Sequence, residues 1–430
     1  MSKKQLYFKR TMMASAVALC MTGISAFAAD TDADSVDVEK LFKEGVYQRE
    51  QGNLFTSIEA LQTVLSNQPA LHRARLELAV SYYRTLNFEA AKQQAQTVLD
   101  DPKTPPNVRI AVLAFMAQVK KDEEAMLAQR QVWTPSVSLG LLYDTNVNAG
   151  PSSDVLPGGL VLAPGSRPKD DTAAVLQAGV SHRYNSPTVM RIGESAARFI
   201  WQSQLNLFHR GYFKESDYNL SALTLATGPG WLVPNKWRAN INLQLDDIWL
   251  GGEEIALYSS LNPSVTWEIK EGEITWDAIA LNKDFTRGVD QGRDSNYYAT
   301  GLSVGKMFKG GKVAVQGGVR VFDEQADVSR FSNDGTEFFV GGNFVAWNNG
   351  NVYARYSQKD AKFNGVEPVY NVARDETEER YEVGFGHNFK EGLMKNWKLS
   401  GSYIETHNNS NVSIYNYDRE MTSVNLSRAF

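Results

Sequence analysis

One segment of the chain matches the spacing of a serine nucleophile. Gly301-Leu302-Ser303-Val304-Gly305 follows the G-x-S-x-G pattern, which activates a serine only on a sharp turn between a strand and a helix. Here small and apolar residues alternate on both sides of Ser303, as they do along a β-strand with one wet face. The match is therefore interpreted as accidental, and no catalytic residue is predicted from it.

Metal ligands and cofactor motifs are equally scarce. None of the five histidines has a metal-ligand spacing with another: His72, His182, His209, His387 and His407. There is no glycine-rich phosphate loop and no ladder of aspartates for calcium. The sequence predicts no metal, no cofactor and no enzyme, although a barrel hydrolase that uses His209 or His387 stays open as an unsupported alternative.

The chain begins with the pattern of an export leader. Basic residues among the first ten precede a short uncharged apolar stretch, Thr11 to Ile24, and Ala26-Phe27-Ala28 offers a cleavage site. A signal peptide is therefore predicted over residues 1–28. Cys20, the only cysteine, follows Leu19 rather than a small residue, so it is interpreted as part of the discarded segment and not as a lipid anchor.

Charge excludes one large class of partner. The chain has a formal net charge of −5, and removal of the leader takes away further positive charges. No long basic run is present. A polyanion-binding surface needs clustered Lys and Arg, so nucleic acid is not an expected partner.

Residues 36–128 show an internal repeat with an offset of 34 residues, the period of tetratricopeptide repeats. Gln62-Thr63-Val64-Leu65 recurs as Gln96-Thr97-Val98-Leu99, and Gly45 corresponds to Ala79 where two helices of one repeat would touch. Gly52 stands at a predicted turn between helices, and Leu86 replaces it in the second copy. We expect a periplasmic domain of about two tetratricopeptide-like repeats; a generic pair of helical hairpins is the alternative.

A third helical segment is expected from Pro106 to Lys121 to cover the open end of the stack. So short an array is expected to lean on the barrel or on a partner. Such repeats hold extended protein segments in a concave groove. The positions that normally face this groove are predicted to bind cargo or a periplasmic chaperone, unless their basic residues are only a solvated surface: Phe42, Arg49, Arg73, Leu76, Tyr83 and Arg84.

From about residue 130 the period of apolar residues changes from helical to two. In Trp237–Leu250, apolar residues from Trp237 to Leu245 alternate with Arg238, Asn240, Asn242, Gln244 and Asp246. One face suits lipid and the other suits a wet lumen. Residues 130–430 are therefore predicted to form an outer-membrane antiparallel β-barrel of about fourteen strands, in contact with outer-membrane lipid. The fold class is α plus transmembrane β.

The lengths of the connections support this arrangement. Tight turns are expected at residues 270–273, 309–312 and 348–351, and long polar loops at residues 147–171, 324–334, 361–377 and 408–417. Short turns on the periplasmic side and long loops outside are typical of bacterial barrels. One longer connection, residues 186–196, falls on the short-turn side. The terminal Phe430, on an alternating last strand, resembles the sorting signal that the barrel assembly machinery reads, although Arg428 departs from that pattern.

The segment that opens the barrel is more specific. Residues 138–148 read SLGLLYDTNVN and resemble the first-strand motif of the surface lipoprotein assembly modulator family, the barrel component of type XI secretion. Within it, Tyr143, Asp144, Asn146 and Asn148 carry the resemblance. The order of leader, repeats and barrel also resembles that family. The three polar residues stand where strand one meets its long loop, so a role in stopping the strand is expected of them individually.

The resemblance implies a protein translocator of the outer membrane. Its cargo would be exported proteins, either surface lipoproteins or soluble haem-binding proteins, and the repeats would be a dock for cargo or periplasmic chaperones. A host-contact or colonisation factor that acts through its surface loops and a passive solute porin are the alternatives. The predicted repeats favour translocation, because neither alternative needs them.

Overall fold

The computed structural model describes residues 37–156, 160–290 and 292–430. The chain divides into two compact units. The first contains the helices together with residues 184–200 and 231–233, and the second contains most of the strands. The predicted signal peptide and Cys20 lie outside the described residues.

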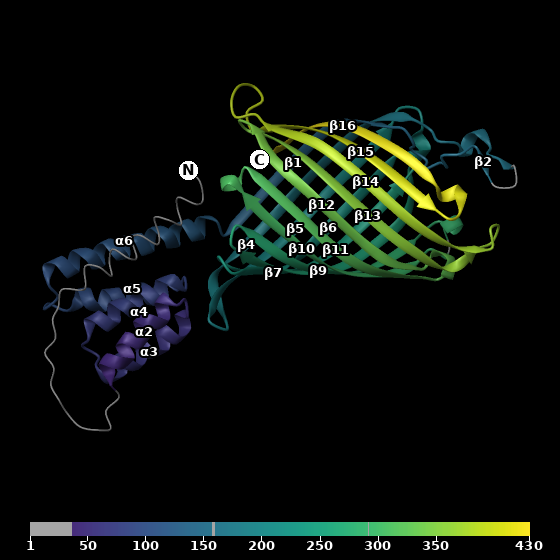
Figure 1. Ribbon diagram of the computed structural model, residues 1–430. Helices are drawn as coiled ribbons and strands as arrows, with labels where there is room; N and C mark the ends of the chain where they lie inside the picture. Colours follow the sequence, from purple (N-terminus) through teal and green to yellow (C-terminus); the bar gives the residue numbers. More distant parts are fainter. Residues whose placement is uncertain (1–36, 157–159, 291) are drawn as a thin grey trace. The chain divides into compact units, whose positions relative to one another are not determined.

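The described part of the first unit contains five α-helices (Figure 1): α2 (Val38–Glu50), α3 (Leu54–Asn67), α4 (His72–Arg84), α5 (Phe88–Asp100) and α6 (Pro106–Ala128). Each helix packs on the next along the chain. Their buried apolar faces form two clusters, one built mainly from α2, α3 and α4 and the other from α4, α5 and α6. Helix α4 contributes to both clusters and so joins them.

Small residues set the distance between the helices, as the repeat pattern predicts. A Cβ added to Gly45 would lie 2.9 Å from Cγ of Leu61, which is fully buried. Ala79, its counterpart in the second copy, is also fully buried. The two turns differ in strain: Gly52 has a φ of 85°, whereas Leu86 adopts a φ of 61° that few side chains tolerate. Tetratricopeptide character itself stays a prediction.

Fourteen strands of the described chain form a closed antiparallel barrel (Figure 1). The first half consists of β1 (Gln131–Asp144), β4 (Asp171–Ile192), β5 (Ser195–Tyr212), β6 (Leu220–Val233), β7 (Trp237–Leu250), β8 (Glu253–Ile269) and β9 (Gly272–Phe285). The second half consists of β10 (Ser295–Phe308), β11 (Val313–Ala326), β12 (Asn333–Trp347), β13 (Gly350–Glu367), β14 (Val372–Asn388), β15 (Trp397–Ser410) and β16 (Tyr417–Ala429). Neighbours in sequence are neighbours in the barrel, and β16 closes it against β1.

Alternation along the strands separates an apolar outer face from a polar inner one. On β7, Leu243 and Leu245 are 51% and 46% exposed, whereas Asp246 accepts hydrogen bonds from Thr224 and Gln244. Large apolar side chains that alternate in this way around a closed barrel are typical of a wall that faces lipid. The even strand number, the closure and the apolar outer face are the architecture of outer-membrane barrels. The predicted barrel of about fourteen strands is confirmed.

Most of the predicted connections agree with the structure, and two were wrong. The predicted loop over residues 361–377 is instead strand on both sides, because β13 continues to Glu367 and β14 begins at Val372. The predicted longer connection over residues 186–196 is also wrong, since β4 and β5 leave only residues 193–194 between them. Gly193, with a φ of 58°, permits that tight turn.

Two further features are a small hairpin in the first loop and a contact between the β4–β5 turn and α3. The long connection between β1 and β4 contains a small hairpin, β2 (Val155–Leu156) with β3 (Leu160–Val161). Within the first unit, the tip of the β4–β5 hairpin contacts α3, where Arg191 pairs with Glu59 and the Glu194 carboxylate accepts a 3.0 Å hydrogen bond from the Thr56 amide. The segment matching a serine nucleophile lies inside β10, as expected of an accidental match.

Candidate functional site

The family-like motif forms the outer end of the seam between β1 and β16. The two strands pair in register from Ser136 opposite Ala429 to Asp144 opposite Met421. Beyond this ladder, the amide of Thr145 donates to the carbonyl of Glu420 at 3.0 Å. The motif therefore stands where the first and last strands of the barrel meet and where the long first loop begins.

Asp144 is the centre of this cluster. Its side chain is fully buried, and Arg419 of β16 binds both of its carboxylate oxygens, with Nε at 2.9 Å from Oδ1. The hydroxyl of Tyr212 donates to Oδ2 at 2.7 Å, and the amide of Asn146 donates to Oδ1 at 3.1 Å. A buried carboxylate is tolerated only when it is paired and hydrogen-bonded in this way. Asp144 thus joins three parts of the barrel wall.

Asn146 and Asn148 attach the first loop to this seam. The fully buried Asn146 side chain donates to the carbonyls of Gly150 and Asp418 at 2.8 and 3.0 Å, and it accepts from the Gly150 amide at 2.7 Å. Asn148 bonds the carbonyl of Arg167 and the amide of Lys169 across the same loop. Both amides satisfy backbone groups that leave the strand ladder, which is the strand-ending role expected of them.

Tyr143 differs from its neighbours in the motif. Its ring is 45% exposed, and its hydroxyl lies 3.5 Å from a carboxylate oxygen of Asp170. The register of β1 places it on the outer face, opposite in direction to the buried Leu142 and Asp144. Sequence reasoning missed Arg419 and Tyr212, because their approach to Asp144 depends on the stagger of distant strands, which the sequence pattern does not determine.

The C-terminal residue lies at the other end of the seam. The amide of Phe430 donates to the carbonyl of Pro135 at 2.9 Å, and the ring is 62% exposed. Arg428 stacks over Phe430 and Trp397, at 4.6 and 5.9 Å from the ring centroids. An arginine on this outward face is thus stabilised by aromatic neighbours. The role of Phe430 as an assembly signal stays a prediction.

Charged side chains of both signs line the inner wall of the barrel. Arg320 of β11 pairs with Asp277 of β9 at 2.8 Å, and Arg238 of β7 pairs with Glu273 of β9 at the same distance. Lys283 of β9 pairs with Glu324 of β11 at 2.6 Å. Each of these pairs bridges over an intervening strand on the inner face. Such a lumen is wet and zwitterionic rather than an apolar core.

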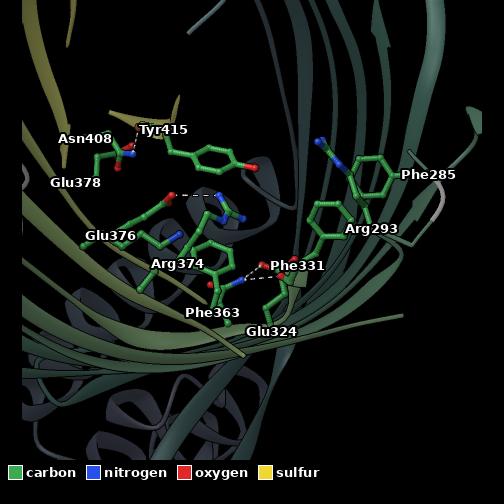
Figure 2. A pocket seen from close by; sticks show the side chains of 13 residues that line it. Phe285, Arg293, Glu324, Phe331, Phe363, Arg374, Glu376, Glu378, Asn408 and Tyr415 are labelled. Atoms are coloured by element: carbon green, nitrogen blue, oxygen red, sulfur yellow. Dashed lines mark hydrogen bonds and ion pairs between the residues drawn. The ribbon is translucent and has the colours of Figure 1, made fainter. Parts of the chain in front are cut away.

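A cavity of about 340 Å³ lies near the outer end of the barrel (Figure 2). In its wall, the Arg374 guanidinium lies 3.7 Å from the ring centroid of Phe363 and 4.1 Å from that of Tyr415. The same guanidinium forms 3.1 Å ion pairs with Glu367 and Glu376. Two aromatic rings and two carboxylates therefore hold the Arg374 side chain in place in the barrel wall.

Lys359 has a different character in the same cavity. It lies 4.8 Å from the ring centroid of Phe322 and also lines a second cavity of about 340 Å³ farther along the wall, with Arg355, Arg380 and Glu382. No carboxylate of the described chain is within ion-pair distance of its ammonium group. Lys359 therefore offers a positive charge that lumenal water or a solute can reach.

The six predicted groove residues fall into two groups. Phe42 and Leu76 are buried in the apolar clusters, and the buried Arg49 pairs with the buried Glu77. Small interhelical gaps explain why positions that face a groove in a longer array are covered here by the next helix. Binding of cargo by these side chains stays a prediction, and it would need the helices to separate.

The other three groove residues are less enclosed. Arg73 lies over the ring of Phe42 at 4.8 Å, and Arg84 donates to the carbonyl of Arg49 at 3.0 Å. Tyr83 donates to the carboxylate of Asp122 at 2.6 Å. These contacts hold α2, α4 and α6 together, so the residues have structural partners whatever else they bind.

Helix α6 is apolar on two sides. Val112, Phe115 and Val119 are buried against the second apolar cluster, so α6 does cover that end of the stack. On its other side Ile110 and Leu113 are 69% and 53% exposed. A terminal helix normally presents a polar outer face. The expected cap is therefore incomplete, because the side of α6 that faces away from the stack leaves Ile110 and Leu113 uncovered.

Other chemistry finds little support in the structure. Among the described residues, no group of three or more His, Asp or Glu could hold a metal ion. His209 contacts the hydroxyl of Ser221 at 2.9 Å, but within the described chain no carboxylate is bonded to that histidine. His387 accepts from the indole of Trp347 at 3.0 Å. No helix of the described residues is long and apolar enough to span a bilayer.

Comparison with known proteins adds the following findings. No family model matches the chain, and no curated protein matches it. Solved structures with a similar fold include Pseudomonas aeruginosa OpdO, at 12% identity and a TM-score of 0.36, covering 70% of this chain and 99% of that one. Acinetobacter baumannii OccAB2 matches at 8% identity and a TM-score of 0.38, covering 70% and 98%. P. aeruginosa OpdK with vanillate matches at 9% and 0.35, covering 69% and 99%. Likeness at this level carries no information on function.

Proposed function

We propose that this protein is an outer-membrane translocator, of the surface lipoprotein assembly modulator type, for specific exported proteins. The cargo class would be surface lipoproteins or soluble haem-binding proteins that travel from the periplasm to the cell surface or medium. The helical unit would lie in the periplasm and receive cargo or its chaperone. The barrel would provide the path or the platform for insertion.

The observation that carries the proposal is the position of the helical unit in the chain. Helices α2 to α6 precede β1, and β1 begins at the end of the barrel where residues 193–194, 270–271 and 348–349 make tight turns. In bacterial barrels that end faces the periplasm. A helical unit joined to β1 at that end would have access to newly exported proteins, and a passive channel has no use for one.

The seam gives the proposal a second support. The motif that resembles the translocator family contributes the buried Asp144, whose partners come from β16 and β5. Replacement of the buried Asp144 or Asn146 would leave buried polar partners unpaired, so this part of the motif is needed to close the barrel. This role is independent of which cargo is moved.

The test is surface exposure of candidate cargo. Exported proteins encoded beside this gene would be tagged, and intact cells would be probed with antibody and with protease, with and without this protein. A barrel that lacks residues 36–128 serves as the second control. Cargo that reaches the surface only with the full-length protein supports the proposal, and failure of the truncated form assigns delivery to the helices.

The opposite outcomes are equally informative. Unchanged cargo exposure in cells that lack the protein overturns translocation. If attachment to host cells falls instead, the surface loops carry the function. Full export by the truncated barrel would reject the helical unit as the dock while leaving the barrel as the path.

A second candidate, a channel for small hydrophilic solutes, is favoured by one specific observation. The inner wall is zwitterionic, and Lys359 borders two wet cavities without a close ion pair among the described residues. Conductance of the purified barrel in planar bilayers tests this candidate. A lumen that passes ions steadily supports it, and a barrel that stays closed in the absence of cargo favours translocation.

A further inference from the structure

The outer face of α6 is the largest unexplained feature of the helical unit. Ile110, Leu113, Ala114 and Ala117 are all exposed and follow the 3–4 spacing of one helix face. Soluble surfaces tolerate single exposed apolar residues, but a stripe over two helical turns marks an interaction site.

The stripe has the composition of a helix-packing surface. Two bulky residues, Ile110 and Leu113, are followed by two alanines that would let another helix approach closely. The opposite face of the same helix shows how such a surface is used, because Val112, Phe115 and Val119 pack there on the helical core. A further helix packed on the exposed face of α6 would therefore continue the stacking pattern of α2 to α6.

Charged residues next to the stripe indicate which charge a partner helix would carry. Lys120 and Lys121 follow Ala117 directly and are both exposed, and the carboxylate of Glu124 lies 3.9 Å from the ammonium group of Lys120. Of the other nearby carboxylates, Asp122 bonds Tyr83 and Glu123 bonds Lys92, so the positive charge of Lys121 remains unbalanced at this C-terminal border. Acidic side chains on an incoming helix would meet it favourably.

We infer that the outer face of α6 docks an amphipathic helix of a partner protein that carries acidic residues beside its apolar face. The inference rests on the proposed function, because exported cargo or its periplasmic chaperone would supply that helix. It deepens the proposal by naming the surface and the chemistry of the partner. Unlike the buried Phe42, Arg49 and Leu76, this surface needs no opening of the helical unit.

The test uses the full-length protein in detergent and two synthetic helical peptides. The first has leucine and alanine on one face with glutamates beside it, and the second has lysines in place of the glutamates. Fluorescence anisotropy should show tighter binding of the acidic peptide. The Ile110→Ser/Leu113→Ser variant should weaken that binding by at least about tenfold, since two apolar contacts are lost.

Two variants make the test specific. Lys120→Glu/Lys121→Glu should reverse the preference to the basic peptide. Tyr47→Ser, which removes an apolar side chain that is 57% exposed on α2, is the matched control and should change neither affinity. All of the substituted side chains are exposed, so helical ellipticity should stay at its wild-type value in each variant.

Several results would overturn the inference. It fails if Ile110→Ser/Leu113→Ser binds the acidic peptide as tightly as wild type, or if both peptides bind equally. Sedimentation that shows a dimer dissolved by the same variant would assign the face to a second copy. Binding to phosphatidylglycerol vesicles that this variant abolishes, without peptide binding, would assign it to lipid.

Cargo exposure on intact cells separates this inference from the proposed function. If peptide binding falls in Ile110→Ser/Leu113→Ser and export falls with it, both stand. If peptide binding falls and export is unchanged, the dock is real but the proposed use is wrong. If export depends on residues 36–128 while peptide binding is unaffected by the variant, translocation stands and the dock on α6 is rejected.

Discussion

Arg419 on the last strand holds Asp144 on the first strand in a two-pronged ion pair, with Nε at 2.9 Å from Oδ1. The Asp144 side chain is completely buried, so its carboxylate is exposed neither to water nor to lipid. The barrel closes between β16 and β1, so this pair spans the closure. The pair therefore connects the motif at the start of the barrel with the residues at its end.

The first prediction concerns this pair. Arg419→Leu should destabilise the folded barrel by about 3–5 kcal/mol, because it leaves a buried carboxylate without its cation. The double variant Asp144→Asn/Arg419→Leu should recover part of that loss. The measurement is the temperature at which the heat-modifiable folded band disappears from a detergent gel.

A matched arginine of the lumen provides the control. Arg380 lies 3.7 Å from Glu382, and both side chains are partly open to the lumen, at 43% and 22% exposure. Arg380→Leu should therefore cost less than about 1 kcal/mol. Equal losses of stability in Arg419→Leu and Arg380→Leu would show that burial of the ion pair at the seam does not increase its contribution to stability.

The sequence allowed the barrel to be predicted because lipid imposes strict alternation. Leu243 and Leu245 must face the bilayer while Gln244 and Asp246 face the lumen, so period and strand number are visible without a structure. Alternation fails where the register of a ladder shifts. The pairing of β13 with β14 shifts between Lys362 and Val366, so the pattern between Ala361 and Thr377 resembles a loop although both strands continue.

The partners of the seam could not be found in this way. Asp144 and Arg419 are far apart in sequence, and their meeting depends on the exact stagger between β1 and β16, which alternation alone does not determine. The helical groove was misleading for a related reason. Repeat spacing identifies equivalent positions such as Phe42 and Leu76, but only packing shows whether the next helix covers them.

A second prediction concerns the contact between α2 and α3. Gly45→Val should destabilise the helical unit by about 1–3 kcal/mol, because a Cβ at this position would already lie 2.9 Å from Cγ of the fully buried Leu61. Lys43→Val, exposed on the same helix, should have a much smaller effect. Loss of helical ellipticity in urea measures both, and equal midpoints for the two variants would contradict the close contact.

A third prediction uses pH. The hydrogen bond from His72, at 2.6 Å, and the amide of Lys103 hold the pKa of Asp101 below its usual value. A depressed folded-state pKa stabilises the fold at pH values above the unfolded pKa of about 3.9, and that contribution disappears as pH falls through the folded value. Asp101→Asn should therefore unfold more easily than wild type at neutral pH.

Acid should remove this difference. As pH falls below about 3.9 and then through the lower folded-state pKa, the carboxyl of wild-type Asp101 becomes protonated. Once that protonation is complete, the helical ellipticity of both proteins should fall at the same urea concentration. A gap between wild type and variant that persists at low pH would mean that Asp101 acts through its shape and neutral hydrogen bonds. It would then have no electrostatic role.

The last prediction tests whether the lumen is open. Lys359 faces the inside of the barrel and borders both cavities, whereas Lys362 on the same strand points to the outer face because side chains alternate along β13. Lys359→Glu should shift the reversal potential in a salt gradient towards cation preference, and Lys362→Glu should leave it near the wild-type value. Since the substitution replaces one charge by its opposite at a wall that solutes must pass, the shift should weaken as the salt concentration rises.

If neither lysine affects the reversal potential while the barrel conducts, ions follow a path away from β13 and β14. If the wild-type barrel does not conduct but cargo export persists, the lumen is closed at rest and the solute-channel candidate is rejected.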